Sequence, residues 1–296
     1  MGVFENPLVA ATGFAISLLI VLSIRKKCEG TTLLRPWLWL VVALGTLAFV
    51  ESLVWLKTRN PAAGPESDVG WIAASRFLSA AALLLPVVSL LGAKRPQDRA
   101  WHLIVLSLWV VLSLPAAESY LLRSGGAIQI HDARGWFLWV LVLTGLVNYL
   151  PTRHWLACSL FAAAQVAHLA GYLPVFRSFV GNARSFPALA ALMVCVAIGL
   201  VVFLPARPGS HSRDQRWQQF CDSFGFLWGM RVAERVNAVS PNSTCRLDWR
   251  RVVETDPQEA PTQGVGSVGA EESSTDHVFE KNFRSHLVRF VNDEWM

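Results

Sequence analysis

The chain has 296 residues, of which 53% are hydrophobic and only 16% are charged, and its formal net charge is +5. This composition is too apolar for a soluble globular enzyme of that length and is typical of a membrane protein with a polar extension. The basic residues are not concentrated in one soluble segment, so nucleic-acid binding is not expected.

Seven apolar stretches occupy the first 205 residues, and the hydrophobicity then stops. A bilayer core of about 30 Å requires about 17–25 mostly apolar residues for each helical crossing. The stretches satisfy this requirement at 8–24, 36–56, 70–92, 101–122, 135–151, 155–173 and 186–205. The predicted fold is therefore all-α: a seven-helix transmembrane bundle over 1–205, with a cytosolic C-terminal helical module over 206–296.

The basic residues also predict the orientation of the bundle. Residues 1–205 carry 15 Lys and Arg against 8 Asp and Glu, whereas residues 206–296 carry 11 against 13. With the N-terminus outside, eleven basic residues fall in inner segments and six in outer segments, as the positive-inside rule requires. We therefore expect a multi-pass protein of the bacterial inner membrane, with its N-terminus outside and its C-terminus in the cytosol.

The tail contains two amphipathic segments separated by a polar one. Apolar residues recur every three or four positions over 213–239, which predicts a long helix with one apolar stripe. A short strand or turn is expected around 246–253, and 254–276 is expected to be a flexible linker. A second helix is predicted at about 277–291. Two such stripes need a partner surface, so we expect the tail to dock under the bundle.

Charged residues inside the predicted spans are the best candidates for a functional site. Glu51, Arg76 and Glu118 lie in three consecutive spans, at about 8, 9 and 6 Å below their outer ends. His168 lies at a similar depth, about 8 Å, in the sixth span. These residues would form an outer polar pocket for a small ligand or a proton, or a structural ion pair that joins helices. The pairing of Arg76 with Glu51 or Glu118 is expected in either case.

No cofactor or metal is expected from the sequence. The five cysteines include no metal-spaced group, and no nucleophile or phosphate-loop motif is present. His154 and His168 are spaced like the bis-histidine helices of b-type cytochromes, but no second span offers matching ligands. We therefore expect a protein that is not an enzyme.

Several tail motifs resemble the tails of uncharacterised multi-spanning bacterial membrane proteins of the planctomycete type. The resemblance lies in the segments 224–237, 247–250 and 290–295. It implies a membrane bundle with a cytosolic helical tail, and no activity or site residue comes with it.

Two functions follow from these patterns. The first is interaction, sensing or assembly, in which the lipid bilayer holds the protein and a cytosolic protein partner binds the tail. The alternative is a transporter or a membrane enzyme that uses the outer polar pocket. Transport would require polar residues at several depths in the bundle. Apart from the outer polar pocket, only Asn148 and Gln165 are candidates.

Overall fold

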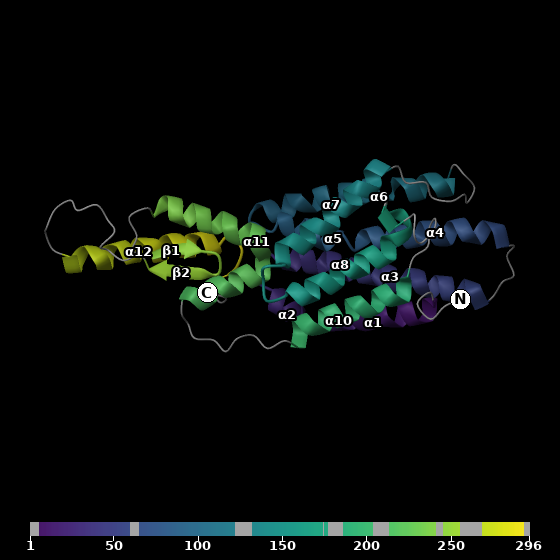
Figure 1. Ribbon diagram of the computed structural model, residues 1–296, viewed down its shortest axis with the longest axis horizontal. Helices are drawn as coiled ribbons and strands as arrows, with labels where there is room; N and C mark the ends of the chain where they lie inside the picture. The colour runs from purple at the N-terminus through teal and green to yellow at the C-terminus, as the bar shows by residue number, and fades with distance from the viewer. Residues whose placement is uncertain are drawn as a thin grey trace.

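The protein is an elongated helical bundle with a smaller module attached to one end (Figure 1). The computed structural model describes residues 6–59, 65–121, 132–173, 175–176, 186–203, 213–240, 245–254 and 268–292. The chain enters α1 at the end of the bundle that lies far from the module (Figure 1). We call this end distal, and the end that carries the module proximal.

The helices of the bundle run along its long axis, and α5 continues α4 after a short break (Figure 1). They are α1 (Pro7–Ser23), the short α2 (Arg25–Cys28), α3 (Leu34–Arg59), α4 (Pro65–Ala82), α5 (Leu85–Leu91), α6 (Gln97–Leu121), α7 (Asp132–Tyr149), α8 (Trp155–Leu169) with the 3-10 turn η2 (Ala170–Tyr172), and α10 (Pro187–Phe203). Their shared core is rich in leucine and in alanine, whose small side chain allows close helix approach.

The predominantly helical fold is confirmed, but among the described residues length and hydropathy single out four helices that could cross a membrane rather than seven. These are Leu34–Arg59, Gly70–Leu91, Arg99–Ser119 and Trp155–Tyr172. Two further apolar helices, Pro7–Ser23 and Pro187–Phe203, have 17 residues each and are shorter than the others. Several apolar helices could therefore cross a membrane, consistent with a membrane protein.

Pro86 produces the break between α4 and α5. Proline cannot donate a backbone hydrogen bond within a helix, and the chain leaves the helix at Leu83 and Leu84. The buried side chain of Gln165 in α8 donates to the carbonyl oxygen of Leu83 at 2.9 Å. Gln165 thus satisfies a backbone acceptor that the break exposes inside the apolar bundle.

The attached module, which we call the tail module, is not purely helical. It comprises α11 (Arg213–Val239), the antiparallel strands β1 (Cys245–Asp248) and β2 (Arg251–Glu254), and α12 (Val268–Leu287). Leu247 of β1 lies opposite Val252 of β2. The strand or turn expected around 246–253 is confirmed, and this hairpin makes the tail module helical with a small sheet rather than purely helical.

The boundaries of the C-terminal helix also differ from the expected ones. α12 begins at Val268 and ends at Leu287, whereas the sequence predicted a helix at about 277–291. Its first turns occupy part of the segment 254–276 that was expected to be a linker. The rest of that segment, 255–267, lies outside the described residues.

The tail module and the proximal end of the bundle share one apolar core. The aromatic side chains of α11 and α12 are fully or almost fully buried against one another, namely Trp217, Phe220, Phe224, Trp228, Phe279, Phe283 and the following Phe290. Leu90 and Ala93 of the bundle belong to the same cluster. The indole of Trp228 also donates to the carbonyl oxygen of Leu90 at 2.9 Å. The tail is thus docked on the bundle by burial and by hydrogen bonding.

Asn148 occupies a break in the middle of α11. At Gly225 the backbone adopts φ 82° and ψ −177°, a conformation that side-chain-bearing residues rarely adopt. The amide of Asn148, near the proximal end of α7, accepts from the Leu227 N–H at 2.9 Å and donates to the Phe224 carbonyl at 3.4 Å. The side chain therefore bridges the two halves of α11, and we call this contact the Asn148 bridge.

We expect Gly225→Ala to destabilise the docked tail strongly. A Cβ atom at Gly225 would lie 2.2 Å from Nδ2 of Asn148, and the positive φ adds about 1–3 kcal/mol of backbone strain. Thermal unfolding of the purified protein, followed by tryptophan fluorescence, measures the effect. Gly45→Ala is the matched control because no atom lies within 4 Å of its added Cβ. An equal melting temperature for the two variants would contradict the bridge.

Candidate functional site

The first candidate site is an ion pair inside the bundle. Nε and Nη2 of Arg76 in α4 donate to Oε1 and Oε2 of Glu51 in α3, both at 2.7 Å. The Glu51 side chain is fully buried, and that of Arg76 is 14% exposed. Two parallel charge-assisted hydrogen bonds are the strongest geometry for such a pair. The expected pairing of Arg76 with a carboxylate is present.

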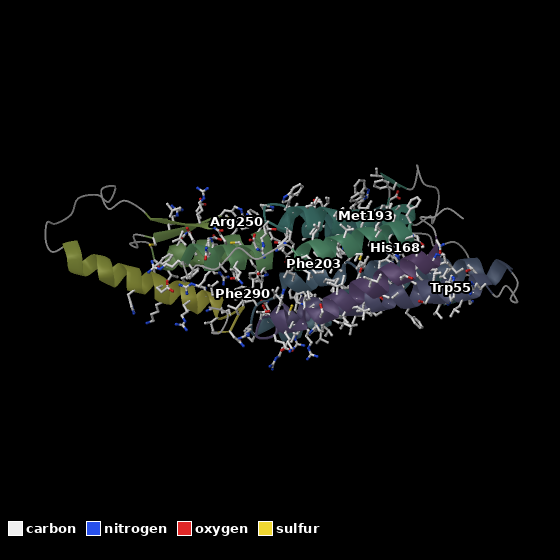
Figure 2. The ribbon with its side chains drawn as sticks, turned by 90° about the horizontal axis from the view of Figure 1, so that it is seen from below. Trp55, His168, Met193, Phe203, Arg250 and Phe290 are labelled. Atoms are coloured by element: carbon white, nitrogen blue, oxygen red, sulfur yellow. The ribbon has the colours of Figure 1, made fainter. Side chains whose placement is uncertain are left out.

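His168 and Tyr172 lie beside this pair. His168 of α8, which is labelled in Figure 2, is buried. Its ring makes an edge contact with Phe14 of α1, and Arg76 is a charged neighbour of both His168 and Tyr172. The hydroxyl of Tyr172 donates to the carbonyl oxygen of Ala73 at 3.3 Å, one turn before Arg76. We call Glu51, Arg76, His168 and Tyr172 the distal polar cluster.

Two features distinguish this cluster from an ordinary structural ion pair. Both ring nitrogens of His168 are buried, and neither forms a hydrogen bond with a described residue. A buried imidazole without a partner is costly, so such groups usually have a functional or solvent partner. The second feature is Arg76, whose remaining exposed fraction offers donors beyond those that Glu51 accepts.

Glu118 does not belong to the cluster. It lies in the last turn of α6, with an exposed side chain, and the structure pairs Arg76 with Glu51 instead. Of the two expected partners of Arg76, the structure therefore selects Glu51. The physical reason is rotational: similar depth along neighbouring helices does not fix which face of a helix a residue occupies.

The second candidate site is the junction between the bundle and the tail module. Asp222 of α11 is buried and accepts from the backbone N–H of Arg153 at 3.1 Å. Its carboxylate also pairs with the Arg153 side chain at 3.5 Å and with Arg250 at 3.1 Å. Arg250 occupies the hairpin turn with φ 62°. Asp222 thus joins the α7–α8 loop, α11 and the hairpin by charge-assisted bonds.

His154 lies at the same junction. Nε of Arg153 donates to Nε2 of His154 at 3.1 Å, which requires that nitrogen to carry no proton. Burial lowers the pKa of His154, and the Arg153 charge lowers it further while Asp222 opposes the shift. The junction therefore holds a neutral imidazole at neutral pH.

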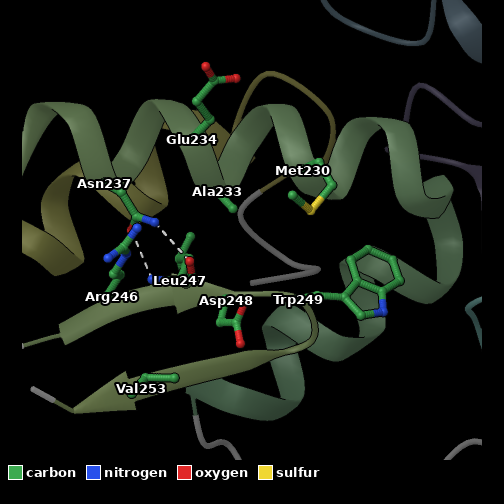
Figure 3. Close-up of a pocket in the computed structure, with 9 residues that line it drawn as sticks. All are labelled: Met230, Ala233, Glu234, Asn237, Arg246, Leu247, Asp248, Trp249 and Val253. Atoms are coloured by element: carbon green, nitrogen blue, oxygen red, sulfur yellow. Dashed lines mark hydrogen bonds between the residues drawn. The ribbon is translucent and has the colours of Figure 1, made fainter.

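The third candidate site is an open groove in the tail module, which we call the tail groove. It has a volume of about 540 Å³ and lies between the second half of α11 and the hairpin (Figure 3). It is lined by Met230, Ala233, Glu234, Asn237, Arg246, Leu247, Asp248, Trp249 and Val253. The Asn237 side chain closes one end by pairing with the N–H and the carbonyl of Leu247, both at 2.8 Å.

Apolar and charged groups alternate along the tail groove. Met230 and Val253 are each 43% exposed at its rim, and Trp249 contributes an aromatic wall. Glu234, Arg246 and Asp248 supply charges of both signs. Such a surface suits a peptide or protein segment better than a small apolar molecule.

The described part of the chain offers no obvious residues that could bind a metal ion or a cofactor. No group of three or more His, Cys, Asp or Glu there could hold a metal ion. His154 and His168 lie at opposite ends of α8, so they do not converge on one site. Comparisons with known proteins found no match to a family model, to a curated protein or to a solved structure.

Sequence reasoning missed the residues that join the tail to the bundle. Gly225 and Asp222 carried no sequence signal, because a glycine or an aspartate on an amphipathic stripe is common. Asn148 was noted only as a polar residue inside a span. An amide within an apolar helix does signal a buried hydrogen-bonding partner, and that signal could have indicated the Asn148 bridge.

We expect Arg76→Leu to lower the melting temperature strongly, because it leaves the fully buried Glu51 without its cation. Removing one partner of such a pair costs about 3–5 kcal/mol. The double variant Glu51→Leu/Arg76→Leu should recover most of the loss, since both charges are gone. Arg25→Leu is the control: its pair with Glu29 is exposed, with side-chain exposures of 62% and 52%, and should contribute little. Additive losses in the double variant would contradict a coupled pair.

Proposed function

We propose that the protein is a seven-span protein of the bacterial inner membrane that acts in interaction, sensing or assembly through its cytosolic tail module. Its N-terminus lies outside the cell and its C-terminus in the cytosol. Residues 1–205 form the membrane part and 206–296 the tail. The observation that carries the proposal is the docking of the tail module through the Asn148 bridge and the shared core, with the tail groove left open.

The outward surfaces of the shorter helices support seven crossings. α7 exposes Trp136, Val140, Leu143 and Val147 at helical spacing, with exposures of 46% or more. A continuous exposed apolar stripe of this kind is unfavourable in water and favourable in lipid. α1 and α10 have 17 residues each and extend about 26 Å, near the lower limit for a crossing.

The distribution of basic residues supports the orientation. Arg25, Lys26 and Lys27 lie at the proximal end, directly after α1, where the tail module is also attached. The positive-inside rule assigns this end to the cytosol. The same assignment places the distal polar cluster near the outer face.

The polar residues within the bundle weigh against a transport path. A path requires polar groups that a substrate can reach at successive depths. Asn148 is engaged in the Asn148 bridge, and Gln165 is engaged at the α4–α5 break. The two extra candidates for such a path thus already have structural roles.

The alternative is that the distal polar cluster binds a small ligand or a proton from the outer side. One observation favours it, namely the two buried ring nitrogens of His168 that have no hydrogen-bonding partner among the described residues. A signal generated there could reach the tail module through α8 and the α4–α5 segment, which contact each other at Gln165 and Leu83. Ligand or proton binding at the distal polar cluster and interaction through the tail module are therefore compatible with one sensing protein.

We expect reporter fusions to divide into two groups. Fusions after Lys27, Gln97 and Met296 should report the cytosolic side, and those after Gly64, Ile128 and Asn182 the outer side, because the basic residues favour the proximal end inside. Paired alkaline phosphatase and fluorescent protein fusions measure this. A C-terminal fusion that is active only outside would overturn the orientation.

We expect the tail groove to contact a protein partner in the cell. A photo-crosslinking amino acid at Met230 or Val253 should give discrete adducts, because both side chains lie at the rim of the groove. The control position is Val278 of α12, which is 47% exposed in the same module but does not line the groove. Adducts of equal yield at all three positions, or at none, would count against the groove as the binding surface.

A further inference from the structure

Four basic side chains converge where the tail module meets the bundle. Lys94 belongs to the loop after α5, Arg235 to α11, and His286 and Arg289 to the end of α12 and the residues after it. Each of Lys94 and His286 has Arg235 and Arg289 as charged neighbours. We call these four residues the basic cluster.

The backbone fixes this convergence. The N–H of Arg95 donates to the carbonyl oxygen of Arg289 at 2.9 Å, which holds the α5–α6 loop against the end of α12. Arg235 follows Trp228 by two helical turns and so shares its face of α11. The Trp228 ring lies 5.0 Å from that of Phe290, next to Arg289.

Lys94, Arg235 and Arg289 supply the positive charges of the basic cluster, whereas His286 contributes a neutral imidazole at neutral pH because its pKa is lowered. None of the four residues forms an ion pair with a carboxylate among the described residues. Burial, and then repulsion by the neighbouring arginines, lowers the pKa of Lys94 and of His286. Like charges that meet in this way destabilise the docked tail unless an anion lies among them.

The position of the basic cluster indicates where the anion comes from. Lys94 lies three residues after Leu91, the last residue of the candidate span Gly70–Leu91. Even a fully helical path would place it only about 5 Å beyond the apolar segment, at the level of lipid headgroups. Basic groups in this position attract anionic headgroups at about 1 kcal/mol each.

We propose that the basic cluster of Lys94, Arg235, His286 and Arg289 binds the phosphate of an anionic phospholipid, which thereby holds the tail module against the bundle. The inference rests on the proposed membrane placement, but not on its orientation. The headgroup phosphate accepts from side chains of three separate elements, the α5–α6 loop, α11 and the end of α12. Anionic lipid is thus part of the docking interface.

The test compares the full-length protein in nanodiscs of phosphatidylcholine with nanodiscs that also contain phosphatidylglycerol. We expect phosphatidylglycerol to raise the melting temperature by several degrees and to be retained in native mass spectra. The double variant Lys94→Gln/Arg289→Gln should bind phosphatidylglycerol about 30-fold more weakly, because two basic contacts are lost. Arg289 is exposed and Lys94 half-buried, so neither substitution removes a core contact.

Lys26→Gln/Lys27→Gln is the matched control. It removes the same charge from the proximal end, but at two exposed residues outside the basic cluster. Equal loss of lipid binding in the two double variants would show a general surface effect and overturn the proposal. An equal stabilisation by inorganic phosphate in phosphatidylcholine nanodiscs would assign the cluster to a free anion and reject the lipid.

One further variant tests whether acidic residues of the protein itself, rather than a lipid, neutralise the basic cluster. If Asp293→Asn/Glu294→Gln changes the melting temperature and lipid composition does not, the proposal fails. Because both faces of a nanodisc are accessible, these results do not depend on orientation. Reporter fusions that reverse the topology would therefore overturn the proposed orientation without affecting this test.

Discussion

The insertion of Asn148 into the break of α11 is the contact on which the rest of the architecture depends. A side-chain amide carries both N–H donors and an acceptor oxygen, so it can bond a backbone carbonyl and a backbone N–H on either side of Gly225. The break turns the two halves of α11 so that their aromatic residues join the core under Leu90 and Ala93. The bundle and the tail module consequently share one apolar core at the proximal end.

A second side-chain amide stabilises another break in the backbone, this time inside the bundle. Pro86 interrupts the α4–α5 segment, and Gln165 donates to the carbonyl exposed at Leu83. In both cases one amide side chain stabilises a backbone irregularity that an apolar environment would otherwise penalise. One amide side chain is enough at each break, which accounts for the small number of polar residues inside the bundle. Because both amides are engaged in these structural hydrogen bonds, they are poor candidates for a transport path.

The two ends of the protein have different electrostatic character. At the distal end a buried carboxylate is neutralised by Arg76, beside an imidazole that has no hydrogen-bonding partner among the described residues. At the proximal end Asp222 is surrounded by Arg153 and Arg250, whereas the basic cluster has no carboxylate partner among the described residues. A signal from one end to the other would have to pass through α7, α8 and the α4–α5 segment, which also carry the two amide contacts.

The sequence by itself determined the predominantly helical fold and most helix positions, because the length and periodicity of apolar segments are local properties that follow from helix geometry. It also determined that Arg76 needs a carboxylate, since burial of a lone charge is too costly. Only the tertiary structure decided that the partner is Glu51 and not Glu118, because the rotation of each helix depends on its neighbours. The roles of Asn148, Asp222 and Gly225 were likewise decided by contacts between residues more than 65 positions apart, to which no local pattern responds.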